Sequence, residues 1–205
     1  MGFKILIAPV RKLNKLANDA MVMQDYESLL ITSVNAVDSV KAGMKVICVG
    51  EKTAQAARIN GGKVDHCFER IENLIDWLSS QNSAQLVYAH GDPISIDLST
   101  IAGLKHHKIR MVKVYEMSTI MWKKHTIFEV ESLREAIFPV FSTKSALSLR
   151  DNLSALSSQF RARIFPISNG VASIFEEKQN LLIESPPEVP NWSLLKQKIE
   201  NAFKN

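Results

Sequence analysis

Residues 29–37 read Leu29-Leu30-Ile31-Thr32-Ser33-Val34-Asn35-Ala36-Val37, an apolar strand that ends in hydroxyl residues and opens a helix. Residues 138–147 repeat this order as Phe138-Pro139-Val140-Phe141-Ser142-Thr143-Lys144-Ser145-Ala146-Leu147. A second pair of similar segments covers 46–54 and 164–172. The two pairs lie at similar offsets, about 109 and about 118 residues along the chain. Similar offsets suggest two related α/β lobes, and chance similarity between short strings is the alternative.

Outward from these segments, short apolar runs alternate with helical stretches along the whole chain. Such alternation predicts parallel strands covered by helices on both faces, an α/β fold. The expected strands are 3–8, 28–33, 45–50, 64–67, 85–89, 109–116, 125–130, 137–141, 162–167 and 180–184. The expected helices are 35–42, 53–59, 71–79, 94–105, 143–157, 169–178 and 193–203. The last helix carries its apolar residues on one stripe, which predicts a docking helix; these residues are Leu194, Leu195, Ile199 and Phe203.

Composition is that of an ordinary globular protein. The chain has 205 residues, of which 46% are hydrophobic and 22% charged, so disorder, collagen and disulfide scaffolds are excluded. No apolar run is long enough to cross a membrane, and the short N-terminal run is soon followed by Arg11 and Lys12, unlike a signal peptide. A cytoplasmic protein without a membrane partner is expected. The net charge of +4 is too small to indicate nucleic-acid binding, but it is compatible with an anionic small molecule.

Motifs for metals, nucleotides and serine nucleophiles do not occur in the sequence. The histidines lack His-Glu-x-x-His spacing, and there is neither a Gly-x-Gly-x-x-Gly nor a Walker loop, so no cofactor and no metal are expected. Cys48 and Cys67 lie in apolar runs and are expected to be core residues. The basic clusters 105–108 and 123–125 are interpreted as solvated surface, with attraction of a polyanionic ligand as the alternative.

Hydroxyl residues stand where expected parallel strands end, which is the edge of such a sheet that binds ligands. Thr32, Ser33, Thr53 and Ser142 therefore offer hydroxyls and helix N-termini to a carboxylate or phosphate. The alternative is that each of them only caps a helix. Tyr115, at the end of another strand, is either a packing residue or a phenol that donates a proton.

An ordered set of segments resembles the uroporphyrinogen-III synthase family across essentially the whole chain. In the first of the two lobes these are residues 30–37, then 49–57 with a following Gly61 or Gly62, and then 86–92 and 112–116. The other lobe supplies 140–146 and 184–186. No single motif is specific; their shared order carries the resemblance.

The resemblance implies two flavodoxin-like lobes with parallel sheets, joined by a two-stranded connector, with the active site in the cleft between the lobes. One discontinuous lobe would comprise 1–9 and 122–205. The connector strands would be 10–16 and 116–121, and the lobe 17–115 would be inserted between them. The family's first strand and helix have no counterpart here, so the strand at 137–141 is expected to have an open edge. A monomer is expected, although such an edge can promote dimerisation.

The resemblance also implies a reaction that needs neither cofactor nor metal. The substrate would be hydroxymethylbilane, a linear tetrapyrrole with eight carboxylates. Loss of its hydroxyl would give an azafulvene-like cation, and attack by the last pyrrole through its substituted carbon would give a spiro intermediate. Uroporphyrinogen III, with the last ring inverted, would follow. Uncatalysed closure gives the uninverted isomer, so the task is to hold one geometry.

By resemblance, Tyr115 is the catalytic residue and assists departure of the hydroxyl. The substrate-binding residues would be Thr32, Ser33, Thr53, Gly91, Ser142, Thr143 and Ser168. The chain departs from the family's Gly-Pro-Thr-Thr-Ala motif at residues 168–172, where Gly170 and Val171 replace the threonine pair. The alternative function is a non-catalytic two-lobed binder of an anionic small molecule on the same scaffold. A domain that docks a protein partner is a third hypothesis.

Overall fold

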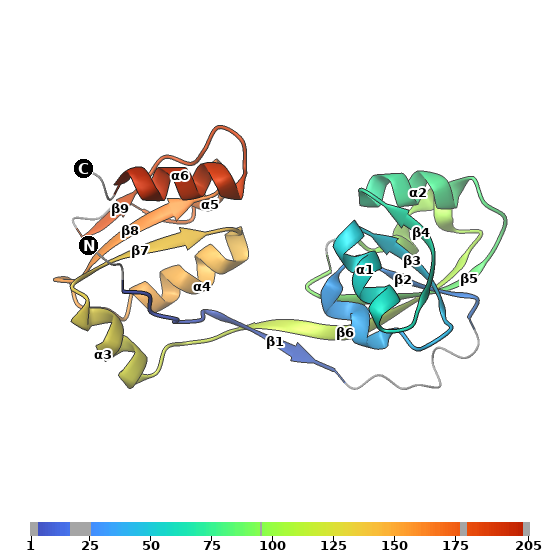
Figure 1. The fold of residues 1–205 in the computed structure, drawn as a ribbon, viewed down its shortest axis with the longest axis horizontal. Helices are drawn as coiled ribbons and strands as arrows, with labels where there is room; N and C mark the ends of the chain where they lie inside the picture. Colours follow the sequence, from blue (N-terminus) through green and yellow to red (C-terminus); the bar gives the residue numbers. More distant parts are fainter. Residues whose placement is uncertain (1–3, 17–25, 95, 177–179, 203–205) are drawn as a thin grey trace. The chain divides into compact units, whose positions relative to one another are not determined.

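A computed structural model describes residues 4–16, 26–94, 96–176 and 180–202. Their contacts divide the chain into two compact units. Unit 1 combines Met1–Lys12 with Thr119–Asn205, and unit 2 is Leu13–Ser118 (Figure 1). The chain passes between the units along β1 (Arg11–Lys15) and β6 (Lys108–Thr119), which are neighbours in one sheet. These two strands are antiparallel, because Leu16 N donates to Val114 O while Ile120 N donates to Val10 O.

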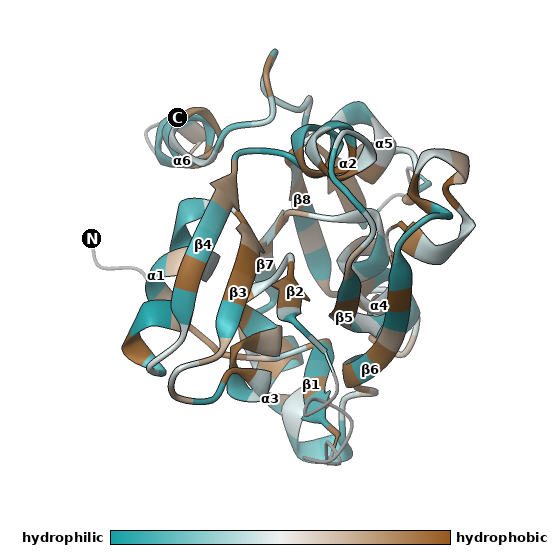
Figure 2. Ribbon diagram, turned by 90° about the vertical axis from the view of Figure 1, so that its right-hand side faces the viewer, coloured by the Kyte–Doolittle hydropathy of each residue, from teal (hydrophilic) through white to brown (hydrophobic). Residues whose placement is uncertain are grey.

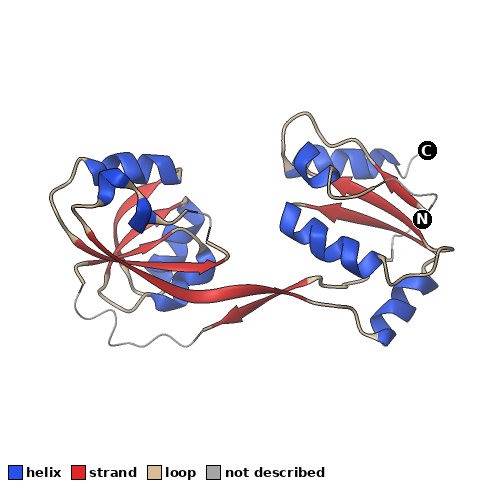
Figure 3. Cartoon of the chain, turned by 180° about the vertical axis from the view of Figure 1, so that it is seen from behind, coloured by secondary structure: helices blue, strands red, loops and turns tan. Residues whose placement is uncertain are grey.

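The sheet of unit 2 has the strand order β1-β6-β5-β2-β3-β4. Apart from β1, its strands run parallel; they are β2 (Ser28–Ile31), β3 (Lys45–Val49), β4 (Lys63–Phe68), β5 (Gln85–Asp92) and β6. The strong apolar colour of β2 and β3 in Figure 2 reflects burial on both faces. Figure 3 shows helices on the two sides of this sheet.

Each face of this sheet packs on its own helices, because alternate residues of a strand point to opposite faces. Leu29 and Ile31 share one cluster with α1 (Glu51–Ile59) and the 3-10 helix η2 (Val34–Ser39). Leu30 lies in the other cluster with Leu74 and Leu78 of α2 (Ile71–Ser79) and with the 3-10 helices η3 (Leu98–Thr100) and η4 (Ala102–Leu104). Burial of each of these leucine side chains contributes about 2 kcal/mol to the free energy of unfolding. The expected parallel α/β architecture is confirmed.

Unit 1 holds a second parallel sheet in the order β7-β8-β9, formed by β7 (Glu135–Val140), β8 (Arg161–Pro166) and β9 (Leu181–Ile183). Its helices are α3 (Lys124–Ser132), α4 (Thr143–Leu153), α5 (Asn169–Ala172) and α6 (Trp192–Ala202). The predicted docking helix corresponds to α6 and buries Leu195 completely. Leu194 is 41% exposed, so its assignment to the buried stripe is wrong, and Phe203 lies outside the described residues.

Four predicted elements differ from the structure. Residues 4–8 of the first expected strand form no strand: Leu6 and Ala8 pack on the unit 1 core while Ile5 and Ile7 are more than 80% exposed. The expected strand 125–130 is helix α3, because Ile127 and Val130 face the core at a spacing of three residues. The other two are the expected helices 94–105 and 35–42, which form 3-10 helices.

The expected helix 94–105 is two 3-10 turns, because the Asp97 carboxylate accepts hydrogen bonds from the Ser99 backbone and hydroxyl and competes with helical bonding. The expected helix 35–42 is the 3-10 helix η2. Two further helices stop early, with α4 ending at Leu153 and α5 at Ala172. The expected helices extend further, to Ser157 and to Lys178. Lys178 lies outside the described residues.

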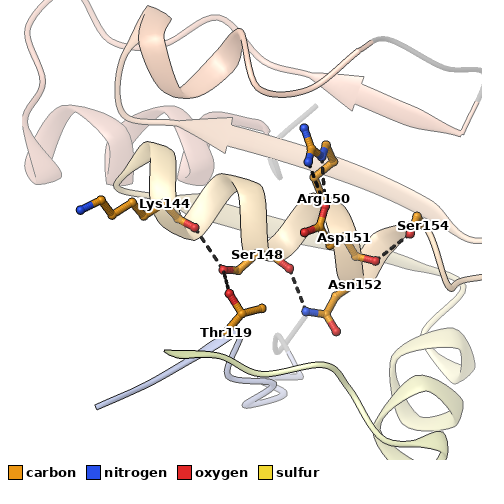
Figure 4. A network of polar contacts seen from close by, with 7 residues as sticks. All are labelled: Thr119, Lys144, Ser148, Arg150, Asp151, Asn152 and Ser154. Carbon is orange, nitrogen blue, oxygen red and sulfur yellow. Dashed lines mark hydrogen bonds and ion pairs between the residues drawn. The ribbon is translucent and has the colours of Figure 1, made fainter. Parts of the chain in front are cut away.

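A polar network anchors the end of β6 in unit 1 (Figure 4). The Ser148 hydroxyl shares a 3.0 Å hydrogen bond with Thr119 and donates to the Lys144 carbonyl oxygen. One turn further along α4, Asn152 Oδ1 accepts from Trp122 N at 2.6 Å, and Nδ2 donates to the Ile120 and Ser148 carbonyl oxygens. Ser148 and Asn152 are both buried. Asn152 therefore satisfies the backbone where the chain leaves β6, while Ser148 on the same face of α4 binds the Thr119 side chain.

The cysteines differ from the expectation that both are core residues. Cys48 is fully buried, and burial is the largest cause that raises its pKa to about 11. Cys67, its register neighbour on β4, is exposed, so the expectation for it is wrong. Among the described residues, no helix is both long enough and apolar enough to cross a membrane.

We expect the substitution Arg134→Gly to raise the free energy of unfolding by about 0.5–1 kcal/mol. Arg134 follows α3 with a φ of 61°, a left-handed conformation that costs a side-chain-bearing residue about 1 kcal/mol and that glycine adopts freely. Arg134→Ala retains the Cβ and is the matched control. Urea unfolding curves of the two variants test this, and equal stability of both would contradict it.

Candidate functional site

The carboxyl edge of the unit 2 sheet collects most of the predicted site residues of that unit. Thr32 and Ser33 follow β2, Thr53 lies in the first turn of α1 after β3, Gly91 is near the end of β5, and Tyr115 is on β6. Because these strands are parallel, their carboxyl ends share one edge.

Tyr88, which was not among the predicted site residues, joins Thr32 at this edge. Its phenol lies 2.9 Å from Thr32 Oγ1, and its side chain is buried. Burial is the main cause that raises the pKa of Tyr88; the hydrogen bond with Thr32 acts in the opposite direction, and the nearby Tyr115 adds to the rise. Tyr88 therefore remains a neutral phenol that orients the Thr32 hydroxyl. Its place in the segment 86–92 was the available signal, but the partner lies 56 residues away.

Gly91 and Tyr115 lie close together at this edge. They are register partners across β5 and β6, and a Cβ atom built on Gly91 would lie 2.2 Å from both Cε2 and Cζ of Tyr115 and 2.6 Å from its hydroxyl. The hydroxyl end of the ring, rather than its base, thus lies over the glycine. Tyr115 is half-buried and also packs against the core on the α1 side. Only a residue without a side chain at position 91 permits this placement of the phenol.

Ser33 and Thr53 each stand at the start of a helix in unit 2. Ser33 is the N-cap of η2, and its Oγ accepts from Asn35 N at 3.2 Å, as the capping alternative predicts. Thr53 is buried in the first turn of α1, where its backbone N–H donates to Gly50 O. The Ser33 hydroxyl keeps its own donor proton for a ligand, since it accepts in the capping bond.

One lysine near this edge is paired with two carboxylates. Lys113 Nζ lies 3.2 Å from Asp92 Oδ2 and 3.5 Å from Glu116 Oε2, all on exposed side chains. The hydrogen bond to Asp92 is the largest cause that raises the pKa of Lys113, so this lysine stays protonated. Exposed pairs of this kind contribute little to stability.

The basic cluster 105–108 is not wholly solvated surface, as one of its members is a buried structural residue. His107 Nδ1 accepts from Ala84 N at 3.1 Å, and its Nε2 lies 2.9 Å from the Leu78 carbonyl oxygen. The imidazole therefore ties the end of α2 to the amino end of β5. The solvated interpretation is wrong for His107, which is held at the opposite end of the strands from the predicted site.

The remaining predicted residues belong to unit 1, at the carboxyl ends of β7 and β8. Ser142 is the N-cap of α4; its Oγ accepts from Ser145 N and lies 3.0 Å from Ser145 Oγ. Thr143 is exposed in the first turn of α4. Ser168 is in the N-cap position of α5 but makes no side-chain capping bond among the described residues.

The described part of unit 1 also contains a cavity of about 530 Å³. It lies between the C-terminal part of α4, the segment after α5 and the amino ends of β8 and β9; its lining includes Arg150, Leu156, Phe160, Ile174 and Leu181. None of the predicted site residues lines it. Across the described ranges, no three His, Cys, Asp or Glu side chains are grouped so that they could hold a metal ion.

We expect Gly91→Ala to lower the free energy of unfolding by about 1–3 kcal/mol, because the new methyl group must displace the Tyr115 ring. A contact of 2.2 Å is far inside the van der Waals distance, and the ring can yield only by rotating away from its position. The same substitution in a Tyr115→Ala background is the matched control, in which the clash is absent. Thermal unfolding of the four variants should give a destabilisation by Gly91→Ala that disappears in this background. Equal destabilisation in both backgrounds would show that the ring does not cause it.

Comparison with known proteins adds four findings. The profile of a family described as uroporphyrinogen-III synthase HemD matches residues 1–178. The crystal structure of uroporphyrinogen-III synthetase from Helicobacter pylori is similar with a TM-score of 0.67 and 18% identity, over 97% of this chain and 95% of that chain. Uroporphyrinogen III synthase from Thermus thermophilus, at 14% identity, covers 95% of this chain and 88% of that one with a TM-score of 0.41. No curated protein sequence matches the chain. The likeness to the Helicobacter pylori structure shows a common fold.

Proposed function

The chain belongs to the uroporphyrinogen-III synthase family, and from this premise we propose that the carboxyl edge of the unit 2 sheet carries the groups that act on the substrate. The chain is an enzyme of tetrapyrrole biosynthesis, a cyclising lyase that closes hydroxymethylbilane to uroporphyrinogen III with loss of water. The roles of individual residues are the proposal. The observation that carries it is the contact of the Tyr115 hydroxyl end with Gly91, at the edge that also holds the Thr32–Tyr88 hydrogen bond.

Departure of the substrate hydroxyl is the step in which Tyr115 acts. As the carbon–oxygen bond breaks, the oxygen keeps the electron pair, and the pyrrole nitrogen lone pair forms the azafulvene-like cation. The Tyr115 phenol donates a hydrogen bond to the departing oxygen, which stabilises its developing negative charge. A free phenol has a pKa of about 10 and is a weak acid, so this contribution is one of positioned hydrogen bonding. The proton lost from the terminal pyrrole on closure balances the water that leaves.

Substrate carboxylates are the ligands of the hydroxyl residues. In unit 2, Tyr88 holds the oxygen of Thr32 and Ser33 presents its hydroxyl at the start of η2, whereas Thr53 is buried in the first turn of α1. In unit 1, we assign the same role to Ser142, Thr143 and Ser168, which stand at the carboxyl ends of β7 and β8. Hydrogen bonds to charged acceptors are stronger than neutral ones, so a few hydroxyls suffice to orient a flexible substrate with many carboxylates. The missing capping bond of Ser168 leaves its hydroxyl available.

We further propose that the enzyme works in the cytoplasm as a monomer. A substrate with eight carboxylates does not cross a lipid bilayer unaided, so the enzyme must share a compartment with the reaction that supplies it. Light scattering at several protein concentrations tests the monomer, and a mass that doubles with concentration would contradict it.

Incubation with hydroxymethylbilane, followed by oxidation and chromatographic separation of isomers I and III, tests the proposed function. Spontaneous closure gives isomer I, so an excess of isomer III that scales with protein concentration is expected. Formation of isomer I alone, at the uncatalysed rate, would instead support the non-catalytic binder of an anionic molecule.

A further inference from the structure

Two large aromatic side chains lie exposed against each other in unit 1. Phe141 and Trp192 are each 53% exposed, and their ring centroids are 5.5 Å apart with planes tilted by 57°. Aromatic residues of this size contribute most to stability when they are buried, and about half of each of these two residues is exposed. The fold gains little from holding both rings half in water, which suggests that they meet a ligand.

The backbone on both sides fixes this pair in place. Phe141 directly follows the carboxyl end of β7 and precedes Ser142, the N-cap of α4. Trp192 opens α6, and the Asn191 carboxamide oxygen caps this helix by accepting from Ser193 N at 2.7 Å. Both rings therefore stand on capped helix starts, at the same end of unit 1 as the hydroxyls of Ser142 and Thr143.

The surroundings of the pair match one chemical class of ligand. Ser142, Thr143 and Lys144 follow Phe141 and are exposed, and in Figure 4 the Lys144 ammonium extends away from the other labelled side chains. An exposed aromatic pair followed directly in the chain by two exposed hydroxyl residues and a lysine suits an aromatic ring that carries carboxylates. A pyrrole ring with acetate and propionate substituents, as in the proposed tetrapyrrole substrate, is such a ring.

We propose that Phe141 and Trp192 form a stacking surface for one pyrrole ring of the tetrapyrrole, whose carboxylates meet Lys144 and the neighbouring hydroxyls. The inference rests on the proposed function and deepens it, because it assigns to this edge of unit 1 a contact with the ring as well as with its carboxylates. Trp192 and Phe141 are positioning residues: they hold a ring and take no part in breaking or forming a bond. Their loss should raise KM and leave kcat nearly unchanged.

The test compares Trp192→Ala with Trp192→Phe and with Phe128→Ala. Phe128 is a matched control, since it is a 74% exposed aromatic residue on α3 of the same unit. Trp192→Ala removes the larger of the two stacking surfaces, so it should raise KM for hydroxymethylbilane about tenfold. Trp192→Phe should stay within about threefold of the wild type because it retains a π face. Thermal unfolding of each variant separates this effect from loss of folded protein.

A second measurement keeps this inference distinguishable from the proposed function. Calorimetric titration with uroporphyrin III should give binding to the wild type that Trp192→Ala weakens about tenfold. Isomer III formation with a KM that Trp192→Ala leaves unchanged would overturn the inference alone. Formation of isomer I only, with uroporphyrin binding that still depends on Trp192, would overturn the catalytic function and leave the inference standing. Absence of uroporphyrin binding to the wild type would overturn the inference, as would a dimer that Trp192→Ala dissociates.

Discussion

Replacing Asn152 by alanine is expected to lower the free energy of unfolding of unit 1 by about 3 kcal/mol. The carboxamide is 1% exposed and makes three hydrogen bonds, one accepted from Trp122 N and two donated to the carbonyl oxygens of Ile120 and Ser148. Alanine removes all three and leaves the Trp122 N–H and the Ile120 carbonyl without partners. A buried polar group without a partner costs about 1–3 kcal/mol.

Urea unfolding, followed by both tryptophan fluorescence and far-ultraviolet circular dichroism, measures this loss. The two probes are needed because two units need not unfold in a single transition. Asp151→Ala, next to Asn152 on the exposed side of α4, is the control; its pair with Arg150 is solvated and should contribute less than about 1 kcal/mol. A loss below about 1 kcal/mol for Asn152→Ala would show that the segment after β6 is held by other contacts.

The segments that the sequence predicted well are those whose burial pattern is local. The helix expected at 71–79 coincides with α2, because Leu74 and Leu78 lie one turn apart on its buried face. The strand expected at 125–130 failed for the opposite reason. Its β-branched and aromatic residues favour a strand, yet only Ile127 and Val130 reach the core, and that spacing is helical.

The candidate site was predictable as a set of residue types at strand ends, but its contacts were not. Gly91 meets Tyr115 only because the register between β5 and β6 shifts by one residue after His90, so that Val114 is passed over. Without this irregularity, Gly91 would face Val114. Nothing in the composition of either strand marks where such a shift occurs. The Thr32–Tyr88 hydrogen bond likewise depends on the pairing of β2 with β5, which a single sequence does not reveal.

The substitution Tyr115→Phe is expected to lower kcat for formation of uroporphyrinogen III about 100-fold while KM stays within about threefold. Phenylalanine keeps the ring on Gly91 and removes only the hydroxyl, so binding of the ground state should persist while the hydrogen bond to the departing oxygen is lost. The isomer ratio gives an independent readout. Spontaneous closure continues in the variant, so the fraction of isomer I should rise as the catalysed route slows.

The two other tyrosines of the chain supply the controls. The Tyr26 ring packs beside Lys108, at the amino end of the strands. Tyr26→Phe removes only the hydroxyl of this ring, so kcat should not change. Tyr88→Phe removes the hydrogen bond to Thr32 and should cost about 1 kcal/mol of stability, with an effect on KM because Thr32 loses its orientation. Full turnover in a folded Tyr115→Phe variant would refute the role of this phenol in the departure of the hydroxyl. The edge of unit 2 would then act by holding the substrate in a closing geometry, through Thr32 and Ser33.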